Sequence, residues 1–367
     1  MKHVLMALGS YDYSAHKGIA RFASENKWHL NSSVLKTFQM PHNWNGDGII
    51  TSLNNNDRIV QFINEANVPV VDISSWREDV EVPRVTADNF NIGEVAAEHF
   101  LEMGHHNFAW FALSLNPVGK ERYEGFRVSL KDAGFDLTRI DKSRAQDGPT
   151  IVSRLLELPK PCALFCKSDY DAAWICDLCY NSNIKVPEQI AVLGVDNNEL
   201  ICQNQSIPLS SINHNLERIG YEGAAMLESL MNNDTHHIDR KLIKPDGITI
   251  RRSTNSLVVT DPLVSETLTY LEKNLHRPIS TDDIAEAFGT TRKKIETRFR
   301  QQLHSTIRDK LIRMRIEKSK MMLKEGAKPI EDIAALTGFC HASHFSNTFK
   351  KLTGMAPTSY KRKSQRQ

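Results

Sequence analysis

The pattern of apolar residues changes near residue 255, and this change limits the folds that the chain can adopt. Residues 1–250 alternate short β-branched runs with stretches of helical apolar spacing. Strands that alternate with helices in this way indicate βαβ units and parallel sheets. From Asp261 onward the apolar spacing is helical throughout. We therefore expect an α/β domain over residues 1–254, a linker over 255–261 and an all-α domain over 262–367.

The helical part contains an internal repeat. The segment 283–285 recurs 49 residues later as 332–334, and Gly289 recurs at the same spacing as Gly338. In each copy the pattern predicts a short helix, a tight turn with glycine and a second helix, which is the helix-turn-helix unit. A long basic helix is predicted between the copies, over residues 306–324, and we expect it to hold them rigidly.

Charge separates the two parts of the chain as well. The net charge is +2, but residues 261–367 hold 21 lysines and arginines against 12 acidic residues, whereas residues 1–260 hold 25 against 32. A basic C-terminal third on an acidic body indicates that only this third meets a polyanion such as DNA. A generic helical bundle with a basic surface is the alternative.

The second helix of a helix-turn-helix enters the major groove, and its exposed residues near the N-terminus meet base edges. Arginine and lysine suit guanine and phosphate groups, and glutamate can accept from cytosine. The second copy carries less charge, so we expect it to contribute less of the salt-dependent affinity. The residues predicted to face DNA are Thr291, Arg292, Lys293, Lys294, Glu296 and Thr297 in the first copy, and His341, Ala342, Ser343, His344, Asn347 and Thr348 in the second.

Several other classes of protein do not fit the composition. No apolar run is as long as the about 18 residues that a bilayer-spanning helix needs. The N-terminus is too polar for a secretory signal. We therefore expect a cytoplasmic protein with no membrane partner. The six cysteines are expected to stay reduced. Cys176 and Cys179 have a spacing seen in metal sites, but they fall in a predicted buried helix with no second pair, so no metal or cofactor is expected.

Polar residues follow several predicted strands of the α/β part. Parallel sheets bind ligands in the crevice at the carboxyl ends of their strands. Carboxylates accept hydrogen bonds from paired hydroxyls, while asparagine and arginine donate to oxygens, so the set suits a polyhydroxylated ligand. Each single aspartate could instead cap a helix. The candidate ligand-binding residues are Tyr11, Tyr13, Asp88, Asn89, Arg122, Asp169, Asp196 and Asn197.

The sequence shows no catalytic grouping. A glycine-rich phosphate loop, a G-x-S-x-G elbow and an HExxH motif are all missing. Asp88, Asp169 and Asp196 could in principle act as glycosidase acids, but nothing in the sequence favours that chemistry over binding. We therefore expect no enzymatic activity and no catalytic residues.

Residues 262–362 resemble the AraC-type DNA-binding domain. The resemblance rests on the segments 333–339 and 343–360, which follow the family's pattern. It implies two recognition helices that enter two successive major grooves. One departure is His341, which stands where the family usually has an acidic residue or asparagine.

Residues 1–254 resemble the periplasmic-binding-protein-like sensor of LacI-type regulators. The segments that carry the resemblance are 85–105, 122–126, 186–197, 209–212 and 252–254. It implies two lobes with parallel sheets, and three passages of the chain between them, near residues 112–114, 210–213 and 246–249. In that family, residues at the positions of Asp88, Arg122, Asp169 and Asp196 contact the effector.

The order of the two domains also matches a type of bacterial sugar-operon regulator, in which the sensor comes first and the AraC-type domain last. This resemblance implies a homodimeric activator that responds to D-xylose or a related sugar, binds a double-stranded DNA operator and acts on RNA polymerase. Three alternatives stay open: another small molecule as effector, a partner protein in the cleft, and a sugar-acting enzyme joined to a DNA-binding domain.

Overall fold

The computed structural model describes residues 1–37, 39–41, 44–114, 116–140, 147–233, 240–255, 258–259, 261–326 and 328–364, with the side chains of 324, 325, 363 and 364 excepted. The chain divides into two compact units. Unit 1 comprises Met1–Ala97 and Asn107–Asn255, and unit 2 comprises Glu98–His106 and Ser256–Gln367. Unit 2 thus also takes in residues 98–106, which the sequence analysis placed in the α/β domain. Residues 256, 257 and 260 of the predicted linker lie outside the described residues.

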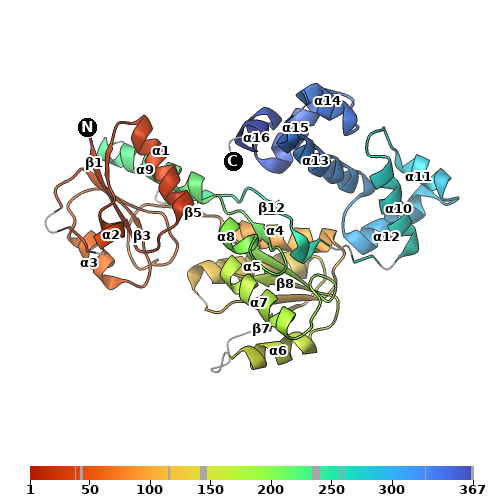
Figure 1. Cartoon of the computed structure of the whole chain (residues 1–367), viewed down its shortest axis with the longest axis horizontal. Coiled ribbons are helices and arrows are strands. Elements are labelled where there is room, and N and C mark those ends of the chain that lie inside the picture. Colours follow the sequence, from red (N-terminus) through yellow and green to blue (C-terminus); the bar gives the residue numbers. More distant parts are fainter. Residues whose placement is uncertain are drawn as a thin grey trace. The chain divides into compact units, whose positions relative to one another are not determined.

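The first lobe of unit 1 is built on a six-stranded sheet whose described pairings are all parallel. Its strand order is β11-β5-β4-β3-β1-β2. The strands are β1 (His3–Leu8), β2 (His29–Asn31), β3 (Gly48–Ser52), β4 (Val70–Asp72), β5 (Arg84–Ala87) and β11 (Arg240–Ile243). The helices are α1 (Tyr13–Glu25), α2 (Val34–Thr37), α3 (Asp57–Glu65) and α9 (Leu216–Met231). Figure 1 shows the green α9 among the red and orange elements of this lobe.

The second lobe has a six-stranded sheet of order β12-β10-β9-β8-β6-β7, which is parallel except for the edge strand β12. Its strands are β6 (Phe108–Phe111), β7 (Leu137–Ile140), β8 (Cys162–Cys166), β9 (Ile190–Val195), β10 (Ser210–Ile212) and β12 (Ile248–Thr249). The helices are α4 (Asn89–Glu102), α5 (Pro117–Asp132), α6 (Gly148–Glu157), α7 (Asp169–Asn181), α8 (Glu199–Cys202) and the 3-10 turn η1 (Arg252–Thr254). The predicted parallel sheets are confirmed, with one antiparallel edge.

The apolar runs of the sequence become the buried strands of these sheets. Every residue of β8 and β9 is buried, because helices cover both faces of a parallel sheet. Cys176 and Cys179 lie in the hydrophobic core against β8 and β9, as expected for structural thiols. Among the described residues no cluster of histidine, cysteine and acidic side chains could hold a metal ion.

The chain passes between the lobes after β5, after β10 and after β11. The first passage was expected near residues 112–114, and that prediction is wrong. Strand β6 already belongs to the second sheet, so the chain changes lobes before it, at Asp88. Helix α4 packs directly on α5 of the second lobe: a Cβ atom at Gly93 would lie 2.2 Å from the Arg122 carbonyl oxygen. The other two passages, at 213–215 and 244–247, lie close to the predicted positions.

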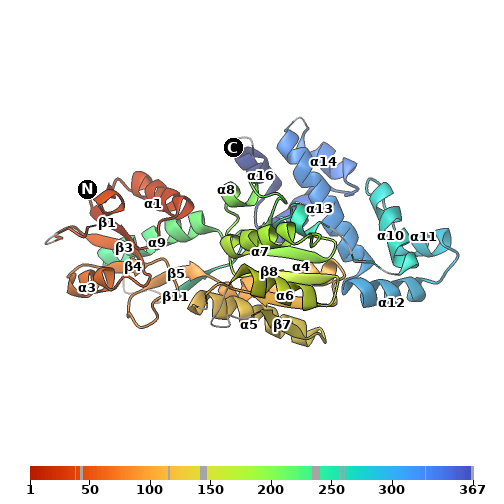
Figure 2. The ribbon, with the colours of Figure 1, turned by 60° about the horizontal axis from the view of Figure 1, so that its bottom comes forward.

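Unit 2 carries two helix-turn-helix motifs joined by one long helix (Figure 2). The first consists of α11 (Thr281–Ala287) and α12 (Arg292–Leu303), and the second of α14 (Ile330–Leu336) and α15 (Ala342–Thr353). The joining helix is α13 (Ile307–Glu325), and α10 (Pro262–Lys273) and α16 (Pro357–Ser364) complete the unit. The repeated glycines adopt positive φ angles, 59° at Gly289 and 77° at Gly338, which explains why each turn carries this residue.

Helix α13 belongs to the cores of both motifs. Ile307 and Leu311 pack with α10, α11 and α12, whereas Ile316 and Leu323 pack with α14 and α15. Arg315 adds a polar link, because its guanidinium donates to the backbone carbonyls of the α10–α11 turn and lies 5.9 Å from the Phe339 ring of the second motif. The long helix therefore fixes the two motifs in one body, as predicted.

Local sequence signals set the helix ends of unit 2. The Asp261 carboxylate accepts from the backbone N–H groups of the first turn of α10. Ser280 and Asp283 form a capping box at α11, in which each side chain accepts from the other residue's backbone. In the described part of the chain, no helix is both long and apolar enough to span a membrane.

Candidate functional site

The three passages between the lobes leave from the carboxyl ends of β5, β10 and β11. In both parallel sheets the loops at these ends carry the predicted ligand-binding residues. Tyr11 and Tyr13 follow β1, and Asp88 and Asn89 follow β5. On the second lobe, Asp169 follows β8, and Asp196 and Asn197 follow β9, while Arg122 lies on α5. This is the edge at which open α/β sheets bind ligands.

Three of these residues form a buried polar cluster around a guanidinium group. Arg122 is only 5% exposed. Its Nε donates to Asn89 Oδ1 at 2.9 Å and its Nη1 donates to the Lys167 carbonyl at 2.6 Å. Asp196 Oδ1 lies 3.8 Å from the same Nη1. Burial lowers the pKa of Arg122, and the surrounding carboxylates oppose that shift. A buried cation requires such partners, so Asn89 and Asp196 hold Arg122 in a defined orientation.

Asp196 is the member of this cluster that remains accessible. Its side chain is 29% exposed, and its Oδ1 atom lies 3.1 Å from Nδ1 of the buried His214. The residue has a φ of 117°, a conformation that costs free energy for any residue with a side chain and that is found at functional sites. His214 is not among the residues predicted from the sequence. The signal for it was its position on the second passage, two residues after β10.

Asp169 is completely buried, whereas a residue that contacts a ligand directly needs an accessible oxygen. Its Oδ1 accepts from Ser211 Oγ at 2.5 Å, and its Oδ2 accepts from the Asn198 backbone N–H at 2.8 Å. A Cβ atom at residue 194 would lie 2.3 Å from Asp169 Oδ1, which explains Gly194. Burial, together with the nearby charge of Asp196, raises the pKa of Asp169 to about 7. In this arrangement Asp169 holds the β9–α8 loop and presents no oxygen to solvent.

The remaining candidates at the carboxyl ends of the strands differ in availability. Asp88 acts as the helix cap that the sequence analysis weighed as the alternative, since its Oδ1 accepts from the Asn91 backbone N–H at 3.0 Å. Asn197 Oδ1 accepts from Arg251 at 2.9 Å. Tyr11 and Tyr13 are 54% and 71% exposed. Among the described residues no polar contact links these tyrosines to the Arg122 cluster.

The exposed face of α12 carries the first set of predicted DNA contacts. Ile295 and Phe299 are buried, so Thr291, Lys293, Lys294 and Thr297 face outward. The depression on this face is shallow and open, and it is lined by Thr291, Lys293, Lys294, Thr297, Arg298 and Gln301. Arg298 and Gln301 are not among the residues predicted from the sequence, although the helical spacing from Lys294 and Thr297 could have indicated them.

Two of the predicted residues on α12 also interact with each other. Arg292 Nε donates to Glu296 Oε1 at 2.8 Å, and its Nη1 lies 3.3 Å from Asp282 Oδ2. These carboxylates raise the pKa of Arg292 and offset part of its charge. Lys293 and Lys294 are therefore the better candidates for phosphate contacts.

Helix α15 presents a less charged face. Phe345 and Phe349 are completely buried, and Ser343, His344 and Asn347 are exposed. His341 precedes the helix but makes no side-chain capping bond, so its imidazole is available to a ligand such as DNA. Ala342 packs against the core of the second motif, and Thr348 is half-buried.

Comparison with known proteins agrees with this division of the chain. A model described as a periplasmic binding protein-like domain matches residues 97–254, and one described as a helix-turn-helix domain matches residues 284–363. The xylose operon regulatory protein of Escherichia coli (strain K12) is 26% identical over 96% of this chain and 94% of its own length. The protein of the same name from Haemophilus influenzae is 24% identical over 96% of this chain and 95% of its own length.

Solved structures share the fold. The structure titled "structure of xylose-binding transcription activator xylR" superposes with a TM-score of 0.61 at 23% identity, covering 98% of both chains. The transcriptional regulator CelR in complex with cellobiose has a TM-score of 0.54 at 22% identity and covers 69% of this chain and 84% of its own. The predicted architecture, a two-lobed α/β sensor followed by a helical domain with two helix-turn-helix motifs, is thereby confirmed, and so is the resemblance to sugar-operon regulators.

Proposed function

We propose that this chain, which is similar along nearly its whole length to xylose operon regulatory proteins, is a sugar-responsive, sequence-specific transcription regulator. D-xylose is the effector that we propose first. The observation that carries the proposal is the presence in one chain of a polar cluster at the carboxyl ends of two parallel sheets and of a basic exposed helix-turn-helix face.

The Arg122 cluster has the chemistry that a sugar requires. Asp196 is partly exposed and can accept hydrogen bonds from two adjacent hydroxyls, and Arg122 can donate to a ring or hydroxyl oxygen. The exposed rings of Tyr11 and Tyr13, on the opposite lobe, can cover an apolar face of the sugar. Asp169 and Ser211 support the loop that carries Asp196, because they accept from the backbone N–H groups of Asn198 and Asn197.

The same geometry favours binding over glycoside hydrolysis. Glycosidases need two carboxyl groups that flank the scissile bond. Asp169 is completely buried, and Asp88 accepts from the backbone at the start of α4. Only Asp196 among the three combines exposure with a position in the cluster.

Regulation would follow from the movement of the two lobes about their three connecting segments. A sugar that contacts both lobes binds one lobe arrangement more tightly than the other and shifts the population toward it. We propose that the chain works as a homodimer in the cytoplasm, that the shift changes the placement of the two DNA-binding domains on the operator, and that the bound dimer activates RNA polymerase.

DNA binding would use α12 and α15 in successive major grooves, since α13 holds the two helices in one body. On α12, Lys293 and Lys294 would contact phosphates, while Thr297 and Arg298 would face the base edges or the adjoining backbone. On α15, His341, His344 and Asn347 are the exposed polar side chains available for base contacts.

A thermal-shift titration of the purified protein against D-xylose, other pentoses and hexoses tests the effector. A sugar at 100 times its dissociation constant stabilises its domain by about 2.7 kcal/mol, which raises the melting temperature by roughly 5–11 °C for a domain of this size. A shift with D-xylose alone supports the proposal as stated, and a shift with another sugar changes the effector only. If no sugar shifts the melting temperature, sugar sensing is refuted and a non-sugar ligand or a partner protein becomes the better hypothesis.

A further inference from the structure

A glutamate outside the expected ligand set lies beside the Arg122 cluster. Glu121 Oε2 accepts a hydrogen bond from Asn89 Nδ2 at 3.1 Å. Because Asn89 uses its amide nitrogen in this way, its Oδ1 is turned toward Arg122, from which it accepts at 2.9 Å. The guanidinium has only donors and therefore pairs with Oδ1, while Glu121 takes the amide nitrogen and holds the Asn89 side chain between the two charged groups.

The other oxygen of Glu121 connects to the opposite lobe. Arg240 Nη2, at the start of β11 in the first lobe, donates to Glu121 Oε1 at 2.9 Å. Strand β11 ends at Ile243 and leads directly into the third passage between the lobes. Glu121 lies on α5 of the second lobe. One carboxylate therefore spans the two lobes with one oxygen and holds the ligand cluster with the other.

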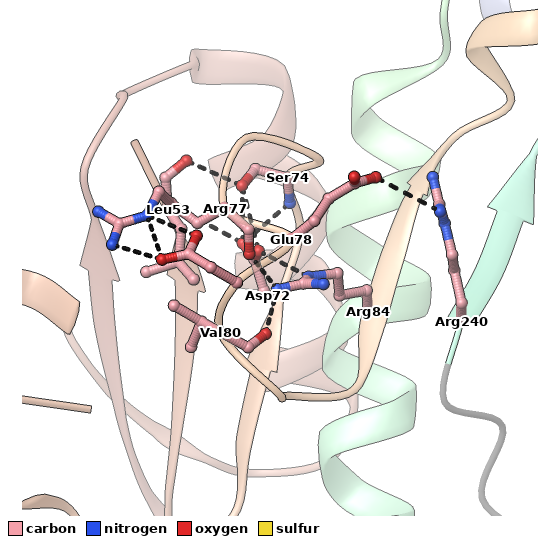
Figure 3. Close-up of polar contacts among 9 residues, drawn as sticks. Leu53, Asp72, Ser74, Arg77, Glu78, Val80, Arg84 and Arg240 are labelled. Atoms are coloured by element: carbon pink, nitrogen blue, oxygen red, sulfur yellow. Dashed lines mark hydrogen bonds and ion pairs between the residues drawn. The ribbon is translucent and has the colours of Figure 1, made fainter. Parts of the chain in front are cut away.

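The first-lobe end of this connection is itself fixed. Arg240 Nη1 lies 3.8 Å from Glu78 Oε1, on the loop after β4 (Figure 3). Arg84 donates to the Arg77 and Val80 carbonyls of that loop, and its guanidinium pairs with the completely buried Asp72 carboxylate at 3.2 Å. A rotation of the lobes would act on the contact between Arg240 and Glu121, because its two ends lie on different lobes.

We propose that Glu121 is a positioning residue for the effector: it orients Asn89 and Arg122, and through Arg240 it makes that orientation depend on the relative position of the lobes. The inference rests on the proposed function and deepens it. Glu121 touches no ligand in this account. It acts through Asn89, and its loss weakens effector binding because Asn89, no longer held at its amide nitrogen, positions Arg122 less firmly.

Helix α5 supplies a matched control. Glu124 lies on the same helix and pairs with Arg127 within that helix, at 2.5 Å. Glu121→Gln and Glu124→Gln make the same chemical change on two partly exposed side chains of α5. Both variants are expected to fold, because glutamine keeps the shape of glutamate. A melting curve without ligand checks this for each protein.

The test is isothermal titration of the full chain with D-xylose, or with the sugar that gives the largest thermal shift. Glu121→Gln is expected to raise the dissociation constant about tenfold, the factor for one hydrogen bond to a charged group, and Glu124→Gln to leave it within twofold. Arg240→Gln is expected to weaken binding as well, and adding it to Glu121→Gln is expected to add less than its separate effect. Equal dissociation constants for wild type and Glu121→Gln overturn the proposal.

A second readout does not depend on the identity of the ligand. Spin labels at Arg58 on α3 and Asp177 on α7, both exposed and on different lobes, report the distance between the lobes, with the exposed Cys340 replaced by serine. Without ligand, Glu121→Gln is expected to broaden the distance distribution, and Glu124→Gln to leave it unchanged. If the wild type binds no sugar, the proposed function fails, and the distance distribution alone decides on Glu121: an unchanged distribution in Glu121→Gln overturns its role.

Discussion

Replacing Asp196 by alanine probes the ligand chemistry most sharply. The carboxylate lies 3.8 Å from Arg122 and 3.1 Å from His214, with 29% of the side chain exposed. In the proposed complex it accepts two hydroxyl hydrogen bonds. Two such bonds to a charged acceptor contribute about 3 kcal/mol at the lower end of their usual range, so the dissociation constant is expected to rise roughly 150-fold.

The cost to folding is a separate quantity. Arg122 keeps its hydrogen bonds to Asn89 and to the Lys167 carbonyl, and the Asp196 contact is long at 3.8 Å. Because Arg122 is buried, the loss of this carboxylate is expected to lower the free energy of unfolding by more than the about 1 kcal/mol of an exposed pair. Operator binding without sugar is expected to stay at the wild-type level, because Asp196 lies in unit 1 and the DNA-binding helices lie in unit 2.

Isothermal titration with the effector and anisotropy with operator DNA measure the two quantities separately. Glu199→Ala is the control, since Glu199 is an exposed acid three residues further along, at the start of α8. A variant Asp196→Ala that binds sugar within threefold of wild type refutes the assignment. A variant that loses both sugar and DNA binding indicates misfolding, which a melting curve identifies.

Three further predictions concern the rest of the chain. Lys293→Ala is expected to weaken operator binding and to reduce the slope of log affinity against log salt by about 1. Arg292→Ala is also expected to weaken operator binding, with sugar affinity unchanged. Equal operator affinity for wild type and both variants would place DNA recognition elsewhere. Gly338→Ala places a Cβ atom 2.3 Å from the Leu275 carbonyl oxygen, while the Cβ atom of Gly289→Ala meets nothing within 4 Å. Both glycines have positive φ angles, so Gly338→Ala should lower the melting temperature of unit 2 more than Gly289→Ala does. An equal decrease of the melting temperature in both variants would contradict this packing. The pKa of Asp169 is raised to about 7, so between about pH 4 and 7 folded unit 1 holds a proton that the unfolded chain has released, and stability falls as pH rises through this window. The Asp169→Asn variant should lack this part of the pH dependence of stability. An identical pH profile for wild type and variant would contradict the pKa shift.

The architecture could be predicted from the sequence because it depends on periodic patterns. Buried strands such as 190–195 consist of unbroken apolar residues, and the two helix-turn-helix copies repeat the same aliphatic, glycine and aromatic positions. The first passage between the lobes was misplaced, since a pattern of strands does not say which sheet a strand joins. Gly93 and Gly125, which allow α4 to approach α5, were the residues that marked the change of lobe.

The candidate site could be predicted less completely. A position after a strand indicates nearness to the sheet edge, and the structure brings Asn89 and Asp196 together there with Arg122 of α5. It does not indicate which oxygen faces solvent, so Asp169 was expected to contact ligand although its carboxylate is buried. Glu121 was missed because its role depends on Arg240, more than 100 residues further along the chain, and such a partner leaves no local signal.

The most direct test of the account is operator binding by the full chain with and without its sugar, measured by fluorescence anisotropy on a duplex selected from a random library. The account predicts that saturating effector changes operator affinity by a factor of about 5–150, the usual range for coupled sites, and that Asp196→Ala removes the change while its basal affinity stays. Operator affinity that is the same at zero and at saturating sugar would contradict the claim that the cleft controls the DNA-binding helices.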